Sequence, residues 1–350
     1  RLAQASSRQA GLSRRRRDLP ASPPSISAAM PQEVAEPAAK RAKVGEEAFT
    51  LRLSGHPCSW GVDYADSPHN PPWEEVIKLM SEAGYAGTEL GPVGYFDPER
   101  LGDLLKSTRL QLVAGNIFEK LHEPSEMKMI LEKVHTSCRT LKKFGAKFFV
   151  IVPHTAPEKE ATAGRPKDAP RLPDDRWAQM MGAIKEVAEV VKSYGIQCTL
   201  HPHAGCWIEY EDEFERAMAD LPADLVSLCL DTGHFTYAGM DPVAKFKKYA
   251  DRIHYMHFKD IDGKVLKRMQ DTKGTFWDGI REGVFCPLGQ GLVDYKAVLG
   301  ALKEAGFSGF ITIEQDFDNK IDDQEKKLKY PGDCSKLNVK YLQNLLSEVN

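Results

Sequence analysis

Three features are absent from this 350-residue sequence, and each absence excludes a class of protein. No apolar run reaches the roughly 18 residues needed to cross a bilayer, which excludes a membrane-spanning body. No two cysteines have the close CxxC spacing that a structural zinc site requires. No glycine-rich GxGxxG motif follows the first apolar run, so nothing supports a dinucleotide-binding site.

Cysteine pairing is also unsupported, because the seven cysteines are odd in number. This indicates reduced thiols in an intracellular compartment, and we expect a soluble protein, most simply a cytoplasmic one. Several cysteines lie inside apolar runs, where a free cysteine is usually a small core residue. The seven are Cys58, Cys138, Cys198, Cys206, Cys229, Cys286 and Cys334.

The N-terminal residues 1–47 differ in composition from the rest of the chain. They are rich in Ala, Ser, Pro and Arg and show no period that could bury an apolar face, so we expect a disordered basic extension. Three interpretations stay open: a transit peptide, a nuclear signal at Lys40, Arg41 and Lys43, or an untargeted leader. Residues 1–45 hold nine Lys and Arg against three Asp and Glu, so a chain total of −3 leaves about −9 for the body. An acidic body is a poor surface for nucleic acid.

From residue 48 onward, short apolar runs alternate with longer amphipathic stretches. The runs predict eight strands, near 51–56, 86–90, 110–115, 147–152, 197–201, 226–231, 252–257 and 309–314. Helical periods lie between them at 71–84, 126–145, 175–195 and 294–306, and three end in a C-cap glycine after a basic or small last turn. Eight βα units predict one α/β domain over 48–350, a closed (β/α)8 TIM barrel, with an open doubly wound sheet as the alternative.

A barrel of this kind gathers reactive residues at the carboxyl ends of its strands. Every predicted strand leads to such a residue, and together they are His56, Glu89, Asn116, His154, His201 with His203, Asp231, His257 and Glu314. A single strand-end histidine is more often a hydrogen-bonded structural residue than a ligand, and His122 and His135 are read that way. Eight strands with the same feature favour a functional site, because each polar group needs a partner when it is buried.

Four of these residues form the predicted metal site: His201, Asp231, His257 and Glu314, from four successive strands. Mixed imidazole and carboxylate ligands suit a divalent ion such as Mn²⁺, Co²⁺ or Mg²⁺. The alternative for Asp231 is a plain helix N-cap. His234 follows Asp231 by one turn, and we expect it to face the cavity and to touch the substrate or a bound water.

Several stretches resemble the xylose isomerase-like TIM-barrel superfamily, most closely its inosose (keto-inositol) dehydratase group, over about residues 50–320. They are "GTELGPVGY", "LHPHAGCWIE", "LCLDTGHFTYAGMDP", "IHYMHFKD", "PLGQGLVDY" and "ITIEQD". The resemblance implies that Asp231, His257 and Glu314 are metal ligands. It also places His201 where the ketose 3-epimerases of the superfamily carry a glutamate that acts as one of two bases.

This departure shapes the expected chemistry. With Glu314 as the base that removes a proton α to a carbonyl, and His234 or Lys259 as the acid, loss of water from a keto-sugar or keto-cyclitol is favoured. If Glu89 or Glu209 acts as a second base, a sugar isomerase or epimerase remains the alternative. Lys259 has an alternative as half of a surface ion pair with Asp260.

The remaining expectations concern the substrate and its surroundings. We expect substrate contacts from His56, Asn116, His154, His203, Glu209 and Trp277. The segment 261–292 is too long for an ordinary loop and is predicted to be a lid, with Trp277 and Phe285 closing an apolar wall. A repair endonuclease is disfavoured by the acidic body, and a non-catalytic sugar-binding protein is a weaker alternative. We expect no membrane partner, and the sequence leaves a homo-oligomer open.

Overall fold

The computed structural model describes residues 49–321 and 323–350. The predicted basic extension over 1–47, with its three alternative interpretations, lies outside the described residues.

Within the described residues, eight parallel strands close into a barrel in the order β1-β10-β7-β6-β5-β4-β3-β2, which confirms the predicted (β/α)8 fold. Each predicted strand is present, and β3 runs further than predicted. The barrel strands are β1 (Leu51–Gly55), β2 (Gly87–Glu89), β3 (Gln111–Glu119), β4 (Phe148–Pro153), β5 (Gln197–Leu200), β6 (Val226–Asp231), β7 (Ile253–Phe258) and β10 (Gly309–Ile313).

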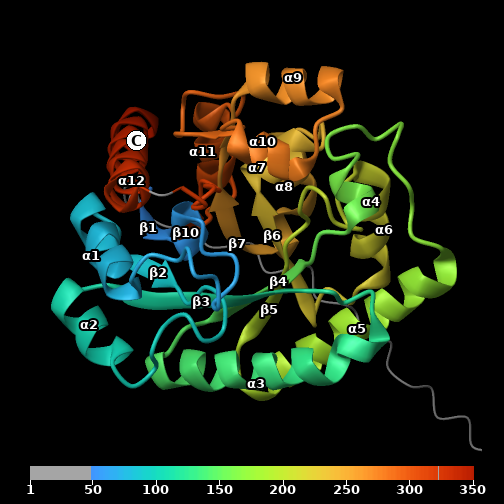
Figure 1. Cartoon of the computed structure of the whole chain (residues 1–350), viewed down its shortest axis with the longest axis horizontal. Helices are drawn as coiled ribbons and strands as arrows, with labels where there is room; N and C mark the ends of the chain where they lie inside the picture. Colours follow the sequence, from blue (N-terminus) through green and yellow to red (C-terminus); the bar gives the residue numbers. More distant parts are fainter. Residues whose placement is uncertain (1–48, 322) are drawn as a thin grey trace, which may run out of the picture. The chain divides into compact units, whose positions relative to one another are not determined.

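Helices surround this barrel (Figure 1). They are α1 (Trp73–Ala83), α2 (Leu101–Thr108), α3 (Met127–Phe144), α4 (Pro157–Glu160), α5 (Asp174–Ser193), α6 (Glu211–Asp220), α7 (Thr232–Tyr237), α8 (Pro242–Tyr249), α9 (Gly263–Thr272), α10 (Phe276–Arg281), α11 (Tyr295–Glu304) and α12 (Gln324–Val349). Short 3-10 turns lie at η1 (Pro57–Trp60), η2 (Pro124–Glu126) and η3 (Ala250–Arg252). None of the described helices has the length and apolar character to cross a membrane.

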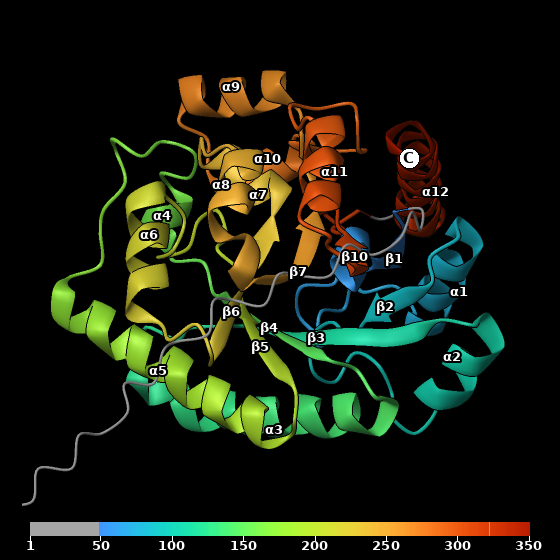
Figure 2. The same ribbon diagram turned by 180° about the vertical axis from the view of Figure 1, so that it is seen from behind.

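Local sequence explains where the outer helices stop. Gly84 and Gly145 end α1 and α3 in the left-handed conformation, with φ of 95° and 73°, and their amides bond back to the last turn. α3 and α5 then pack side by side (Figure 2), and α12 packs against α1. These two predicted glycine stops therefore separate α1 and α3 from the strands that follow them.

The barrel interior is filled by side chains that meet across it. Tyr255 of β7 stacks on Phe148 of β4, with ring centroids 4.8 Å apart. These strands are not neighbours in the sheet, so the contact passes through the interior. Nearer the site the interior becomes polar: the Ser54 and Thr312 hydroxyls lie 2.7 Å apart, and Tyr255 bonds to Thr312. This polar layer supports the residues at the carboxyl ends of the strands.

Candidate functional site

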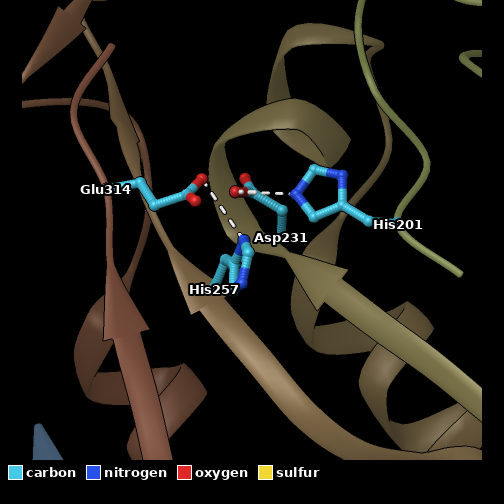
Figure 3. Close-up of side chains that lie close together, drawn as sticks. All are labelled: His201, Asp231, His257 and Glu314. Carbon is cyan, nitrogen blue, oxygen red and sulfur yellow. Dashed lines mark ion pairs between the residues drawn. The ribbon is translucent and has the colours of Figure 1, made fainter. Parts of the chain in front are cut away.

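Four buried side chains meet at the carboxyl ends of neighbouring strands (Figure 3). His201 follows β5, Asp231 ends β6, His257 lies in β7 and Glu314 follows β10, and none is more than 6 % exposed. One potential ligand atom from each lies within 4.8 Å of those of the other three. The four residues predicted from sequence as a metal site are thus brought together by the fold.

The contacts within this group leave atoms free for a cation. His201 Nε2 lies 3.4 Å from Asp231 Oδ2, and His257 Nδ1 lies 3.2 Å from Glu314 Oε2. Asp231 Oδ2 and His257 Nδ1 are fully buried and have no hydrogen-bond partner among the described residues. Because buried polar atoms are normally satisfied, this arrangement fits a bound cation. Two imidazoles and two carboxylates suit a divalent ion such as Mn²⁺ or Co²⁺.

Asp231 combines the two roles that the sequence left as alternatives. Its Oδ1 accepts a hydrogen bond of 2.7 Å from the His234 amide and so caps the N-terminus of α7. Its Oδ2 faces His201 and lies 3.9 Å from Lys259 Nζ. The cap fixes the carboxylate's orientation while the second oxygen stays available as a ligand.

A cavity of about 70 Å³ lies over the four-residue group. Several predicted substrate contacts line it, namely His56, Asn116, His203 and Trp277, together with Lys259. Asn116 Oδ1 and His56 Nε2 are buried and have no hydrogen-bond partner among the described residues. Asn116 Oδ1 can therefore bond to a polar ligand without breaking a contact within the protein, whereas His56 Nε2 lies 3.9 Å from Glu89 Oε2.

His234 does not line this cavity, in contrast to its expected position. α7 begins directly after Asp231, so its first turn carries His234 past the strand end and behind Lys259. The His234 Nδ1 accepts from the Ala204 amide at 3.2 Å, and its Nε2 lies 3.0 Å from Lys259 Nζ. Burial holds the pKa of His234 well below its usual range. Lys259 thus separates this histidine from the cavity.

Besides His234 and Asp231, three other predicted site residues lie outside the cavity lining. Glu89 accepts hydrogen bonds in the barrel interior, from Tyr255 at 2.9 Å and from His257 Nε2 at 2.8 Å. Glu209 accepts from the amides of Gly164 and Gly205, and burial raises its pKa to about 7.

His154 is turned toward protein groups rather than the cavity. Its ring stacks on Phe118 with centroids 4.4 Å apart, and its Nε2 lies 3.0 Å from the Tyr64 hydroxyl. It therefore supports the wall that Phe118 forms.

Lys259 is buried in the cavity wall at 1 % exposure, so the alternative of a surface ion pair with Asp260 is wrong. Its Nζ lies 2.9 Å from Asp316 Oδ1 and 3.1 Å from Glu314 Oε2. Although burial alone would lower its pKa, these carboxylates raise that pKa well above its usual range. His203, His234 and Asp316 form a second group of potential ligands, but the Lys259 ammonium already provides a cation there.

Glu314 is the carboxylate that His56, His257 and Lys259 all approach. Burial alone would raise its pKa, but His257 and Lys259 together hold it well below the usual range. Its Oε1 also lies 3.6 Å from His56 Nδ1. Glu314 is therefore ionised at neutral pH and able to accept a proton or bind a cation.

Sequence reasoning missed several residues that line the cavity, chiefly Cys58, Asp63, Phe276 and Asp316. Asp316 lies two residues beyond Glu314, a spacing that returns to the same side of an extended chain, so it was detectable. Asp63 lies in the irregular connection after η1, where no period applies. Burial and the nearby Asp316 raise the pKa of Asp63 to about 7.

The segment expected as a lid contains regular structure. It holds α9 and α10, which lie next to each other in both views (Figures 1 and 2), and β8 (Asp260–Ile261) pairs with β9 (Phe285–Cys286). Phe276, Trp277 and Ile280 of α10 line the cavity. The Asp260 carboxylate accepts from the amides of Gly289, Gly291 and Val293, which ties the far end of the segment to its beginning.

Comparison with known proteins agrees with this fold. Over residues 72–331 the chain matches the family model described as xylose isomerase-like TIM barrel. It is 27 % identical over 308 residues to a protein named inosose dehydratase from Geobacillus kaustophilus, covering 85 % of this chain and 95 % of that protein.

Two solved structures share the architecture. One is described as the IolI protein with a binding zinc atom, with a TM-score of 0.63, 16 % identity, and coverage of 86 % of this chain and 99 % of that one. The other is L-ribulose 3-epimerase, with a TM-score of 0.62, 16 % identity, and coverage of 86 % and 96 %. With the family model matching well over half of its length, the chain belongs to the xylose isomerase-like TIM-barrel family.

Proposed function

We propose that this protein is a divalent-metal-dependent enzyme that removes a proton α to the carbonyl of a keto-cyclitol or keto-sugar and then eliminates water, as an inosose dehydratase does. The proposal depends on the convergence of His201, Asp231, His257 and Glu314, of which all but Asp231 line the cavity. The name of the relative from Geobacillus kaustophilus supports the cyclitol substrate.

The residues divide the chemistry between them. A divalent ion held by the four-residue group would stabilise negative charge that develops on a substrate oxygen. Glu314, ionised and in the cavity, is the base for the α proton. Lys259, charged and in the cavity, donates a proton to the departing hydroxyl. His234 supports Lys259 from behind and takes no proton from the substrate.

The rest of the cavity suits a small polyol. Asn116 and His56 offer unpartnered polar atoms. Phe276 and Trp277 add apolar surface to the cavity lining, as an ordered lid would. A site with a few placed polar groups and an aromatic wall can orient a cyclitol ring without a charged substituent.

Epimerisation of a ketose is the second candidate, and the unexpected carboxyl groups favour it. Glu89 and Glu209 cannot return a proton to the substrate, because neither lines the cavity. Asp63 and Asp316 do line it, and either could act as a second base. The structural likeness to L-ribulose 3-epimerase shows only the shared fold.

The deciding experiment incubates the metal-loaded protein with keto-inositol, and separately with ketohexoses, in deuterated water and follows the products by NMR. Dehydration gives a product that has lost one water, whereas epimerisation gives an isomer with deuterium at the inverted carbon. Binding of either substrate without turnover or α-deuterium exchange would reject both enzymes and favour a non-catalytic sugar-binding protein.

A further inference from the structure

Glu89 is a fully buried carboxylate that the catalytic scheme above does not use. It ends β2, has no measurable exposure and lies outside the cavity lining. A buried carboxylate without a partner is strongly destabilising, so its partners show what it does. Its nearest partner is His257 Nε2, at 2.8 Å from Glu89 Oε1.

The hydrogen bond between these two residues fixes the proton positions on His257. An ionised carboxylate can only accept, so His257 Nε2 carries the hydrogen and donates it. An imidazole that binds a cation is neutral and has one N–H, so a cation bound at Nδ1 uses the lone pair there and leaves the hydrogen on Nε2. His257 Nδ1 is the atom that faces Glu314 at 3.2 Å within the four-residue group (Figure 3), and it has no hydrogen-bond partner among the described residues.

Glu89 is itself held in place from a second direction. The Tyr255 hydroxyl donates to the same Oε1 atom at 2.9 Å and also bonds to Thr312 of β10. The other oxygen, Oε2, lies 3.9 Å from His56 Nε2, and neither of those atoms has a hydrogen-bond partner among the described residues. Strands β2, β7 and β10 therefore share one polar layer beneath the cavity.

The second imidazole of the group provides an internal comparison. His201 directs Nε2 toward Asp231, but its Nδ1 is buried without a hydrogen-bond partner in the described chain. No carboxylate therefore orients the His201 ring as Glu89 orients that of His257. The two imidazoles differ in how firmly their tautomers are set.

We propose that Glu89 is a positioning residue, which holds His257 in the Nε2–H tautomer and turns its Nδ1 lone pair toward the cation position. This role rests on the metal site of the proposed function, but not on the reaction assigned to it. Carboxylate partners of this kind typically change metal affinity by about ten- to a hundredfold when they are removed.

The principal test is Glu89→Gln, which keeps the size of the side chain and an acceptor oxygen but removes the charge. Titration calorimetry with Mn²⁺ should show affinity weakened on the order of tenfold, because a neutral acceptor holds the imidazole N–H less firmly. The matched control is Glu209→Gln, which makes the same change at a buried carboxylate that accepts from two backbone amides and lies outside the cavity lining. It should lower the melting temperature and leave Mn²⁺ affinity within about twofold of wild type.

A second measurement needs no variant. In the wild-type protein loaded with diamagnetic Zn²⁺, nitrogen-15 NMR of the histidine rings should show the hydrogen of His257 on Nε2 and the metal on Nδ1. Coordination through Nε2, or unchanged Mn²⁺ affinity in Glu89→Gln, would overturn the role of Glu89. Wild-type protein that binds Mn²⁺ but turns over no keto-substrate would instead reject the proposed reaction alone.

Discussion

Asp231→Asn separates the two roles of one carboxylate. Asn caps a helix about as well as Asp, so the bond from the His234 amide to Oδ1 should survive. Oδ2 is the buried and unpartnered oxygen that faces His201. In the variant an uncharged amide NH2 group takes its place, which has no lone pair to offer a cation. The variant should therefore fold with its α7 cap intact and fail to hold a divalent ion.

The size of the effect follows from linkage. A wild-type protein with Mn²⁺ at 100 times its dissociation constant gains about 2.7 kcal/mol of stability. For a barrel of roughly 300 residues, with an unfolding entropy of about 0.6 kcal/mol/K, this raises the melting temperature by about 4 °C. Without metal affinity, Asp231→Asn should show a rise below about 1 °C.

The assay is differential scanning fluorimetry of chelator-treated protein with and without Mn²⁺. Asp241→Asn is the matched control, because Asp241 caps α8 through the Val243 amide at 2.8 Å and lies outside the site. It should keep the full metal-dependent rise. A rise of wild-type size in Asp231→Asn would refute the assignment of Oδ2 as a ligand.

Four further outcomes are expected. Lys259→Met should bind Mn²⁺ but lose about two to four orders of magnitude in turnover, while exchange of the α proton for deuterium persists. If the variant loses deuterium exchange to the same extent as turnover, Lys259 is not the acid. Glu213→Ala should lower the free energy of unfolding by about 3–5 kcal/mol, measured in urea, because it leaves buried Lys159 without its partner at 2.7 Å. The raised pKa of Asp63, about 7 against an ordinary 3.8, means that its contribution to stability is present below pH 4 and is lost as pH rises through 7. Asp63→Asn should therefore flatten that part of the stability profile in metal-free protein, and an unchanged profile would count against the burial of this carboxyl. A chain beginning at Ala48 should melt within about 1 °C of the full chain, since residues 1–47 lack a pattern able to bury apolar surface, and a larger loss would show that the extension packs.

The fold was accessible from sequence because its signals are local and repeated. Eight apolar runs and several glycine stops each specify a short segment, and parallel strands with helical crossovers place all the strand ends on one side. The four candidate ligands follow from that geometry, since each lies at or just beyond the end of a barrel strand.

How far each side chain lies below the mouth of the barrel could not be predicted from the sequence in the same way. The register between β2 and β3 shifts at Thr88 and Glu89, which places Glu89 in the interior beneath the cavity instead of at its mouth. His234 was misplaced because α7 begins without an intervening loop. Both outcomes depend on a shift of one residue or one helical step, which a hydrophobic pattern does not encode.

The hydrogen bonds that Asp260 accepts have a consequence for how the segment over the cavity can vary in sequence and length. By binding three amides at residues 289, 291 and 293, one carboxylate brings the two ends of the intervening segment together independently of what lies between them. Bringing the two ends of a flexible loop together costs only about 0.6 kcal/mol more free energy for each doubling of the loop length. Residues 263–286 include Phe276, Trp277 and Ile280 of the cavity lining, so a different helix pair between the same two ends would change the apolar wall around the substrate without altering the barrel strands.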